Sequence, residues 1–208
     1  MDKKQKKLIS YLIIILLSFL VVFRMLNMGY IRSIDSLASQ SIQNIWSNNF
    51  LNSLMIVFSD YIIYYGLILL SILIFGYFIY KHKRAKAIIF AVSMSLGFII
   101  VEAIKLFFHR IRPFNSLVYE AGFSFPSSHS TMAAIFFLLL IYLFKDSIKN
   151  KFSRIGFIVG SVLLILLTGF SRIFLNVHWL SDVIAGFVLG GVVFVSVVLV
   201  KEIYKIRK

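Results

Sequence analysis

The sequence has no cysteine, only two prolines and only eight acidic residues among its 208. Without cysteine the chain can form neither a disulfide framework nor a thiolate site, so thiol chemistry is excluded. What fills the chain instead is hydrocarbon, since 60% of the residues are hydrophobic and 16% are aromatic. Soluble domains have about 45–50% apolar residues. The composition therefore predicts a membrane protein.

Six apolar stretches approach the length of about 20 residues that a helix needs to cross a membrane. They are Leu8–Phe23, Tyr61–Tyr80, Ala87–Phe108, Thr131–Phe144, Ile155–Leu175 and Leu180–Val200. The fourth stretch is short unless its helix begins within the preceding serines, so Ser127–Ser130 are predicted to form its first turn. We expect an all-α bundle of six transmembrane helices in one membrane-embedded domain, residues 1–208. The basic N-terminus before the first stretch is also typical of a signal peptide, but RMLNMGY contains no small-x-small cleavage site, so we expect an uncleaved anchor.

Basic residues outnumber acidic ones and give a formal net charge of +14. They occur in short groups between the apolar stretches, which is the pattern of a topology signal and not of a nucleic-acid surface. Four groups of four hold sixteen of the 22: Lys3, Lys4, Lys6 and Lys7; Lys81, Lys83, Arg84 and Lys86; Lys145, Lys149, Lys151 and Arg154; Lys201, Lys205, Arg207 and Lys208. The positive-inside rule then places both termini in the cytoplasm. No nucleic-acid partner is expected, and no obligate protein partner is evident.

Six basic residues fall at the opposite, outward ends of the predicted spans: Arg24, Arg32, Lys105, Arg110, Arg112 and Arg172. The first two belong to a polar segment, residues 24–53, which we expect to be an outward-side interfacial segment anchored by Trp46. The other four lie in segments that should meet His129 and His178. Ionisable residues inside spans are costly and usually mark function. Histidines and arginines that converge on one face indicate an anion site, and the fork of arginine suits phosphate.

Three segments contain these residues: KLFFHRIRP (Lys105–Pro113), PSSH (Pro126–His129) and SRIFLNVHWLSD (Ser171–Asp182). Together they resemble the signature of the type 2 phosphatidic acid phosphatases, or lipid phosphate phosphatases. That signature is Lys, six residues and Arg-Pro; then Pro-Ser-Gly-His; then Ser-Arg, five residues, His, three residues and Asp. Every fixed position matches except one, because Ser128 stands where the family has glycine. The three-part active site is therefore expected within residues 105–182.

The resemblance implies a metal-independent reaction through a phosphohistidine. His178 is the implied nucleophile, and Asp182, four residues later, would hold one ring nitrogen and stabilise the imidazolium. His129 is the implied general acid for the leaving oxygen. The resemblance assigns the phosphoryl oxygens to these substrate-binding residues: Lys105, Arg112, Arg172 and Ser127. Ser128 adds a hydroxyl donor at the same helix start, so we expect it to bind phosphate as well.

Several neighbouring charges remain to be placed. Arg110 is a second candidate for a phosphate or headgroup contact, although the motif spacing favours Arg112. Glu102 lies three residues before Lys105, so the two are predicted to pair on one helix face. The outward-side acids are few: Asp35, Asp60, Glu102, Glu120 and Asp182. No two of them have the spacing of a two-metal or His-Glu zinc site, so no metal or other cofactor is expected.

The sequence thus predicts a multi-pass phosphatase of a bacterial plasma membrane with its active site on the extracytoplasmic side. The expected substrate is a lipid such as phosphatidylglycerophosphate, phosphatidic acid or undecaprenyl diphosphate, because the short chain looks most like the bacterial members of the family. A lipid phosphotransferase that uses the same histidine is an alternative. A phospholipid transporter is a further alternative, although it has no need of two histidines and an aspartate.

Overall fold

The computed structural model describes residues 6, 9–10, 12–13, 17, 29–46 and 48–206. Except for single positions, the first predicted span, Leu8–Phe23, lies outside the described residues, as does Arg24. No strand occurs in the described part of the chain. Its elements are α2 (Gly29–Gln43), α3 (Asn49–Ile56), the π-helical segment η1 (Val57–Tyr65), α4 (Gly66–Tyr80), α5 (Arg84–Phe108), α6 (Ser128–Phe144), the short 3-10 helix η2 (Lys145–Ser147), α7 (Lys151–Phe174) and α8 (Leu180–Ile206).

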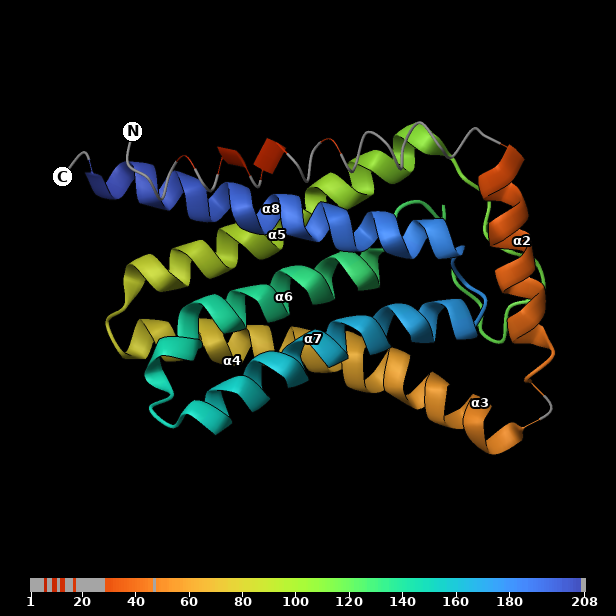
Figure 1. Ribbon diagram of the computed structural model, residues 1–208, viewed down its shortest axis with the longest axis horizontal. Helices are drawn as coiled ribbons and strands as arrows, with labels where there is room; N and C mark the ends of the chain where they lie inside the picture. Colours follow the sequence, from red (N-terminus) through yellow and green to blue (C-terminus); the bar gives the residue numbers. More distant parts are fainter. Residues whose placement is uncertain are drawn as a thin grey trace.

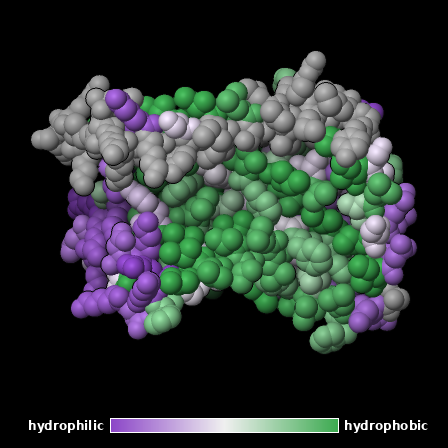
Figure 2. Space-filling view, in the orientation of Figure 1, coloured by the Kyte–Doolittle hydropathy of each residue, from purple (hydrophilic) through white to green (hydrophobic). Residues whose placement is uncertain are grey.

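Five described stretches are long and apolar enough to cross a membrane: Asn49–Tyr80, Arg84–Phe108, Ser128–Ser147, Lys151–Phe174 and Leu180–Ile203. They run along the long axis of the molecule in alternating directions, and α2 lies across one end (Figure 1). We call this end, with loops 109–127 and 175–179, the site end. Hydrophobic side chains cover the middle of the visible face, and hydrophilic ones gather at both ends (Figure 2). Five predicted spans are confirmed as apolar helices, while the count of six and the side of the termini stay predictions.

The second predicted span begins earlier than expected. Its helix starts at Asn49 and not at Tyr61, because Asn48 caps it by accepting the Leu51 N–H at 3.1 Å. Residues 49–53 therefore belong to this long helix and not to the interfacial segment. Polar residues such as Ser53 and Asp60 interrupt the apolar run, so hydropathy alone does not predict where this helix starts.

Helix α6 begins where the serines predicted it. Ser127 is the N-cap, and its Oγ accepts the Ser130 N–H at 3.4 Å. Helix α8 packs very closely against this start: a Cβ at Gly186 would lie 2.8 Å from the Ser127 carbonyl oxygen, and one at Gly190 would lie 2.8 Å from the Thr131 carbonyl oxygen. This small-xxx-small contact brings the first turn of α8 beside the first turn of α6.

Helix α2 rests against the site end of α7 and α8. The Ser39 hydroxyl donates to Asn176 Oδ1 at 2.7 Å, and Trp46 Nε1 donates to the Phe174 carbonyl oxygen at 3.0 Å. Asp35 is buried, with an exposed fraction of 2%. The predicted interfacial segment therefore contains a helix, but Trp46 anchors it to the protein itself.

Candidate active site

The three motif segments meet at the site end. Helix α5 brings Lys105, the loop after it brings Arg112, and the start of α6 brings His129. The last turn of helix α7 brings Arg172, and the short connection to α8 contains His178. The three segments are far apart in the sequence, so their meeting is a result of the bundle and not of local structure.

His178 has its two ring nitrogens in different surroundings, and the ring is only 2% exposed. Nε2 lies 3.2 Å from Arg112 Nη1, and Nδ1 lies 3.6 Å from Asp182 Oδ2. Because a guanidinium can only donate, Nε2 must present the lone pair and Nδ1 the proton. Burial and the charges of Arg172 and Arg112 lower the pKa of His178 well below its ordinary value. The imidazole is therefore neutral near pH 7, with a free electron pair that faces the arginines.

Asp182 lies in the first turn of α8 and is fully buried. Its Oδ2 accepts the Trp179 N–H at 3.0 Å, and its Oδ1 accepts from Arg110 in a short contact. Its backbone carbonyl accepts the Ser127 N–H at 3.1 Å, which ties the third motif to the second. His178 precedes α8, so the pair meets across a helix start and not along one helix face. Within the described part of the chain, His178 Nδ1 has no hydrogen-bond partner, and Asp182 Oδ2 faces it just beyond bonding range.

Glu120, from the loop before α6, fills the centre of the cluster. Its Oε1 accepts from Arg172 in a short contact, and its Oε2 lies 2.7 Å from Arg112 Nη1. The same carboxylate lies 3.7 Å from His178 Nε2 and 3.9 Å from His129 Nδ1. Burial alone would raise the pKa of Glu120, but the charges of the Arg172 and Arg112 guanidinium groups outweigh it and lower that pKa. An ionised carboxylate thus occupies the position expected for an anionic substrate group.

The loop around Arg112 folds back to hold this arginine in place. Arg112 donates to three carbonyl oxygens, those of Val177 at 2.8 Å, Gly122 at 3.1 Å and Ala121 at 3.2 Å. Gly122 has φ +77°, a left-handed conformation that glycine adopts without steric cost. The guanidinium is therefore fixed before any ligand arrives.

Arg172 is fully buried and receives support from η1, which the sequence did not assign to the site. Its Nη1 donates to Ser59 Oγ at 2.5 Å and to Asp60 Oδ1 at 3.1 Å. From the same segment, the Tyr64 ring lies 5.4 Å from the His129 ring, centroid to centroid. Local π-helical geometry is frequent at functional sites, but the local sequence pattern does not predict it here.

The predicted pair of Lys105 and Glu102 is confirmed, with Nζ and Oε1 3.3 Å apart. Ser128 Oγ lies 3.4 Å from the same Glu102 oxygen. The Ser127 hydroxyl is buried and serves as the α6 cap. As phosphate ligands, Ser127 and Ser128 stay predictions.

Each of the five acids on this side pairs with a basic residue. The pairs are Asp35 with Arg110, Asp60 with Arg172, Glu102 with Lys105, Glu120 with Arg112 and Arg172, and Asp182 with Arg110. Sequence reasoning recognised Glu120, Asp60 and Asp35 only as isolated acids. A useful signal was available, because a buried arginine needs a nearby carboxylate.

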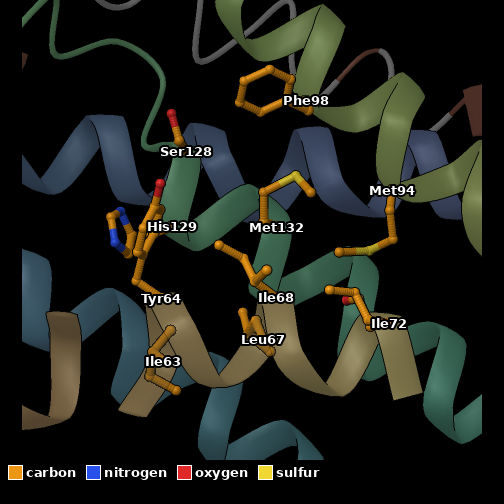
Figure 3. Close-up of a pocket in the computed structure, with 11 residues that line it drawn as sticks. Ile63, Tyr64, Leu67, Ile68, Ile72, Met94, Phe98, Ser128, His129 and Met132 are labelled. Atoms are coloured by element: carbon orange, nitrogen blue, oxygen red, sulfur yellow. The ribbon is translucent and has the colours of Figure 1, made fainter. Parts of the chain in front are cut away.

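An apolar cavity of about 390 Å³ leads to the cluster. Side chains from η1, α4, α5 and α6 line it, among them Ile68, Phe98 and Met132, and Ser128 and His129 lie at its polar end (Figure 3). The cavity lining includes His129 but not His178, so only His129 of the two histidines borders the apolar cavity.

The fold and the site together define a multi-pass membrane protein with a cluster of histidines and arginines at one end of its helix bundle. Residues 86–204 match the PAP2 superfamily model. The chain is also 31% identical over 154 residues to undecaprenyl-diphosphatase BcrC of Bacillus subtilis (strain 168), covering 70% of this chain and 72% of that protein. The chain belongs to the PAP2 superfamily, which confirms the resemblance seen in the sequence.

Two further comparisons agree. Over 122 residues the chain is 32% identical to phosphatidylglycerophosphatase B of Bacillus subtilis (strain 168). That match covers 57% of this chain and 59% of the relative, so the chain spans less than two thirds of that protein. The crystal structure of a transmembrane PAP2 type phosphatidylglycerolphosphate phosphatase from Bacillus subtilis superposes with a TM-score of 0.80 at 24% identity, covering 92% of this chain and 96% of that one. This likeness shows the fold.

Proposed function

We propose that the protein is an integral membrane hydrolase that removes phosphate from a lipid phosphomonoester or diphosphate. The observation that carries this proposal is that His178 Nε2 faces a carboxylate held between Arg112 and Arg172. A carboxylate and a phosphoryl group use the same arginine fork. The names of the relatives, which are lipid phosphatases, support the same reaction class.

In the first step His178 Nε2 attacks phosphorus after Glu120 has left the centre. The N–P bond forms as the bond from phosphorus to the lipid oxygen breaks, which gives a phosphohistidine. Asp182 stabilises the positive charge on the ring, and Arg112 and Arg172 stabilise the equatorial oxygens as charge develops on them.

His129 then has the position expected of the leaving-group acid. The cavity that fits hydrocarbon ends at His129, so a lipid lying there presents its ester oxygen to this ring. His129 gives its proton to that oxygen and then takes one from water, which attacks phosphorus and restores His178. The placement of the cavity at His129 and not at His178 supports this division of roles.

The membrane sidedness and the substrate class follow as parts of the proposal. The described basic segments, residues 81–83 and 145–150, lie at the opposite end of the bundle from the connection between α7 and α8, which contains His178 (Figure 1). By the positive-inside rule the site then opens on the extracytoplasmic side of a bacterial cell membrane, with six spans and both termini inside. The apolar cavity selects a hydrocarbon chain, so phosphatidylglycerophosphate, phosphatidic acid and undecaprenyl diphosphate are the substrates to compare.

Purified protein in detergent tests the proposal through release of inorganic phosphate from these three lipids. Wild-type protein should release phosphate, and His178→Ala should lower the rate by about 10³-fold or more. His82→Ala is the matched control, since His82 is exposed at the far end of the bundle. Full turnover by His178→Ala would contradict the enzyme mechanism. Transfer of phosphate to a lipid hydroxyl without its release would identify a phosphotransferase instead.

A further inference from the structure

Asp35 of α2 lies outside residues 86–204, the part of the chain that matches the superfamily model. Even so, its buried carboxylate binds directly to the start of α8. Oδ1 accepts the Ser181 N–H at 2.9 Å, and Oδ2 accepts the Ser181 hydroxyl at 2.6 Å and Arg110 Nη2 at 2.7 Å. A buried carboxylate with three donors is held in one orientation.

Arg110 connects this carboxylate to Asp182. Its Nη1 donates to Ser181 Oγ at 2.7 Å and to Asp182 Oδ1, while the other oxygen of Asp182 is held by the Trp179 N–H at 3.0 Å. Both oxygens of Asp182 are therefore restrained, so the carboxylate cannot rotate freely. Its orientation toward His178 Nδ1, 3.6 Å away, is therefore set by Arg110 at Oδ1 together with the Trp179 N–H at Oδ2.

The charges alternate along this series, from Asp35 to Arg110 to Asp182. With Asp35 present, Arg110 divides its hydrogen bonds between two carboxylates. Without the Asp35 charge, Arg110 would interact with Asp182 alone and draw it away from the imidazolium that forms during the reaction. That loss would act on the transition state more than on substrate binding.

We propose that Asp35 and Arg110 are positioning residues for Asp182, so that α2 is part of the catalytic apparatus. The proposal rests on the proposed function, because it concerns the same His178. The alternative is a purely structural role, in which α2 covers the end of the bundle and has no effect on Asp182. Arg110, which the sequence left as a possible phosphate contact, then serves the side of His178 that faces away from phosphate.

The test compares two variants that each remove one contact between α2 and the bundle. Asp35→Asn keeps the side-chain shape and removes its charge, and should lower kcat for lipid phosphate hydrolysis about 10- to 100-fold while KM stays within about twofold. Ser39→Ala removes the hydrogen bond to Asn176, which does not reach Asp182, and should leave kcat within about twofold. Thermal unfolding of both proteins shows how much stability each contact provides.

Two further variants separate the positioning role from a structural one. Arg110→Lys keeps the positive charge but can contact only one of the two carboxylates, so its kcat should fall to a similar extent. This variant replaces Asp35→Asn in the test if Asp35→Asn does not fold. In an Asp182→Asn background, adding Asp35→Asn should change kcat by less than about twofold, because the residue it positions has lost its charge. An unchanged kcat in folded Asp35→Asn, or an equal loss in Ser39→Ala, would overturn the positioning role. A wild-type protein that releases no phosphate would refute the proposed function itself.

Discussion

The two sides of the His178 ring use the same chemistry in opposite proportions. On the side of Nε2, where we propose that phosphate binds, the carboxylate of Glu120 lies between the guanidinium groups of Arg112 and Arg172. Asp60 is a further partner of Arg172, and Lys105 pairs with Glu102. On the rear side, facing Nδ1, the carboxylates of Asp35 and Asp182 surround the single guanidinium of Arg110.

In the proposed mechanism this inversion lets one ring act both as a nucleophile and as a stabilised cation. Burial and the guanidinium groups of Arg172 and Arg112 near Nε2 lower the pKa of the imidazole and keep it neutral, while the carboxylate of Asp182 at Nδ1 stabilises the charge that appears when Nε2 forms a bond. Arg110 and Arg112 are two residues apart, yet they serve opposite sides. The role of each arginine therefore depends on which side of the His178 ring it faces and not on its position in the motif.

The largest expected effect, after that of His178 itself, comes from the leaving-group acid on the phosphate side. His129→Ala should lower kcat/KM by about 10²- to 10⁴-fold on a lipid phosphate. The loss in kcat/KM, which reports the steps up to phosphohistidine formation, should be much smaller on p-nitrophenyl phosphate, whose leaving group needs no proton. Steady-state rates on both substrates measure the ratio, and an equal loss on both would contradict the acid role.

The arginine comparison comes next. Arg112→Lys keeps the charge but loses the fork that holds two oxygens, so kcat/KM should fall by about 10²-fold with KM raised. Arg110→Lys should change kcat and leave KM nearly constant. Measured kcat and KM for both variants check this split, and the same pattern in both would show that the two sides are not distinct.

The pH profile tests whether the phosphate side keeps His178 neutral. Protonation of Nε2 removes the attacking electron pair, so kcat/KM should fall about tenfold per unit as pH drops below the pKa of His178. Since this pKa is lowered well below 6.5, the acid limb should lie below that value. A profile that shows no fall down to about pH 3.5, or an acid limb above 6.5, would count against this account.

A smaller effect is expected from the carboxylate at the centre. Glu120 stays ionised because its pKa is lowered, so it competes with any incoming anion. Glu120→Gln removes this competitor, and inorganic phosphate should inhibit the variant about three- to tenfold more tightly. An unchanged inhibition constant would mean that Glu120 does not occupy the phosphate position in the working enzyme.

The smallest effect concerns the one departure from the family motif. Ser128 does not have a positive φ, and it begins α6 without the strain that would require glycine. Ser128→Gly should therefore keep activity or raise it by less than about threefold. A large loss would show that the first turn of α6 is held differently from the structure described.

The helices and the motif residues could be predicted from the sequence because both depend on local patterns. Hydropathy located five described spans, and the serines before Thr131 indicated the start of α6. The role of Glu120 could not be predicted, since it meets Arg172 across 52 residues through a loop without periodicity. The different directions of Arg110 and Arg112 could not be predicted either, nor could the contact of Asp35 with α8. Both depend on how distant parts of the chain pack together.

The central claim is that His178 Nε2 forms a bond to phosphorus. Wild-type protein mixed with lipid labelled at the phosphoryl group and quenched in alkali, where phosphohistidine survives, should show label bound to the protein within one turnover. His178→Ala should show none. Rapid phosphate release by wild-type protein, with no labelled protein at any time, would contradict the account.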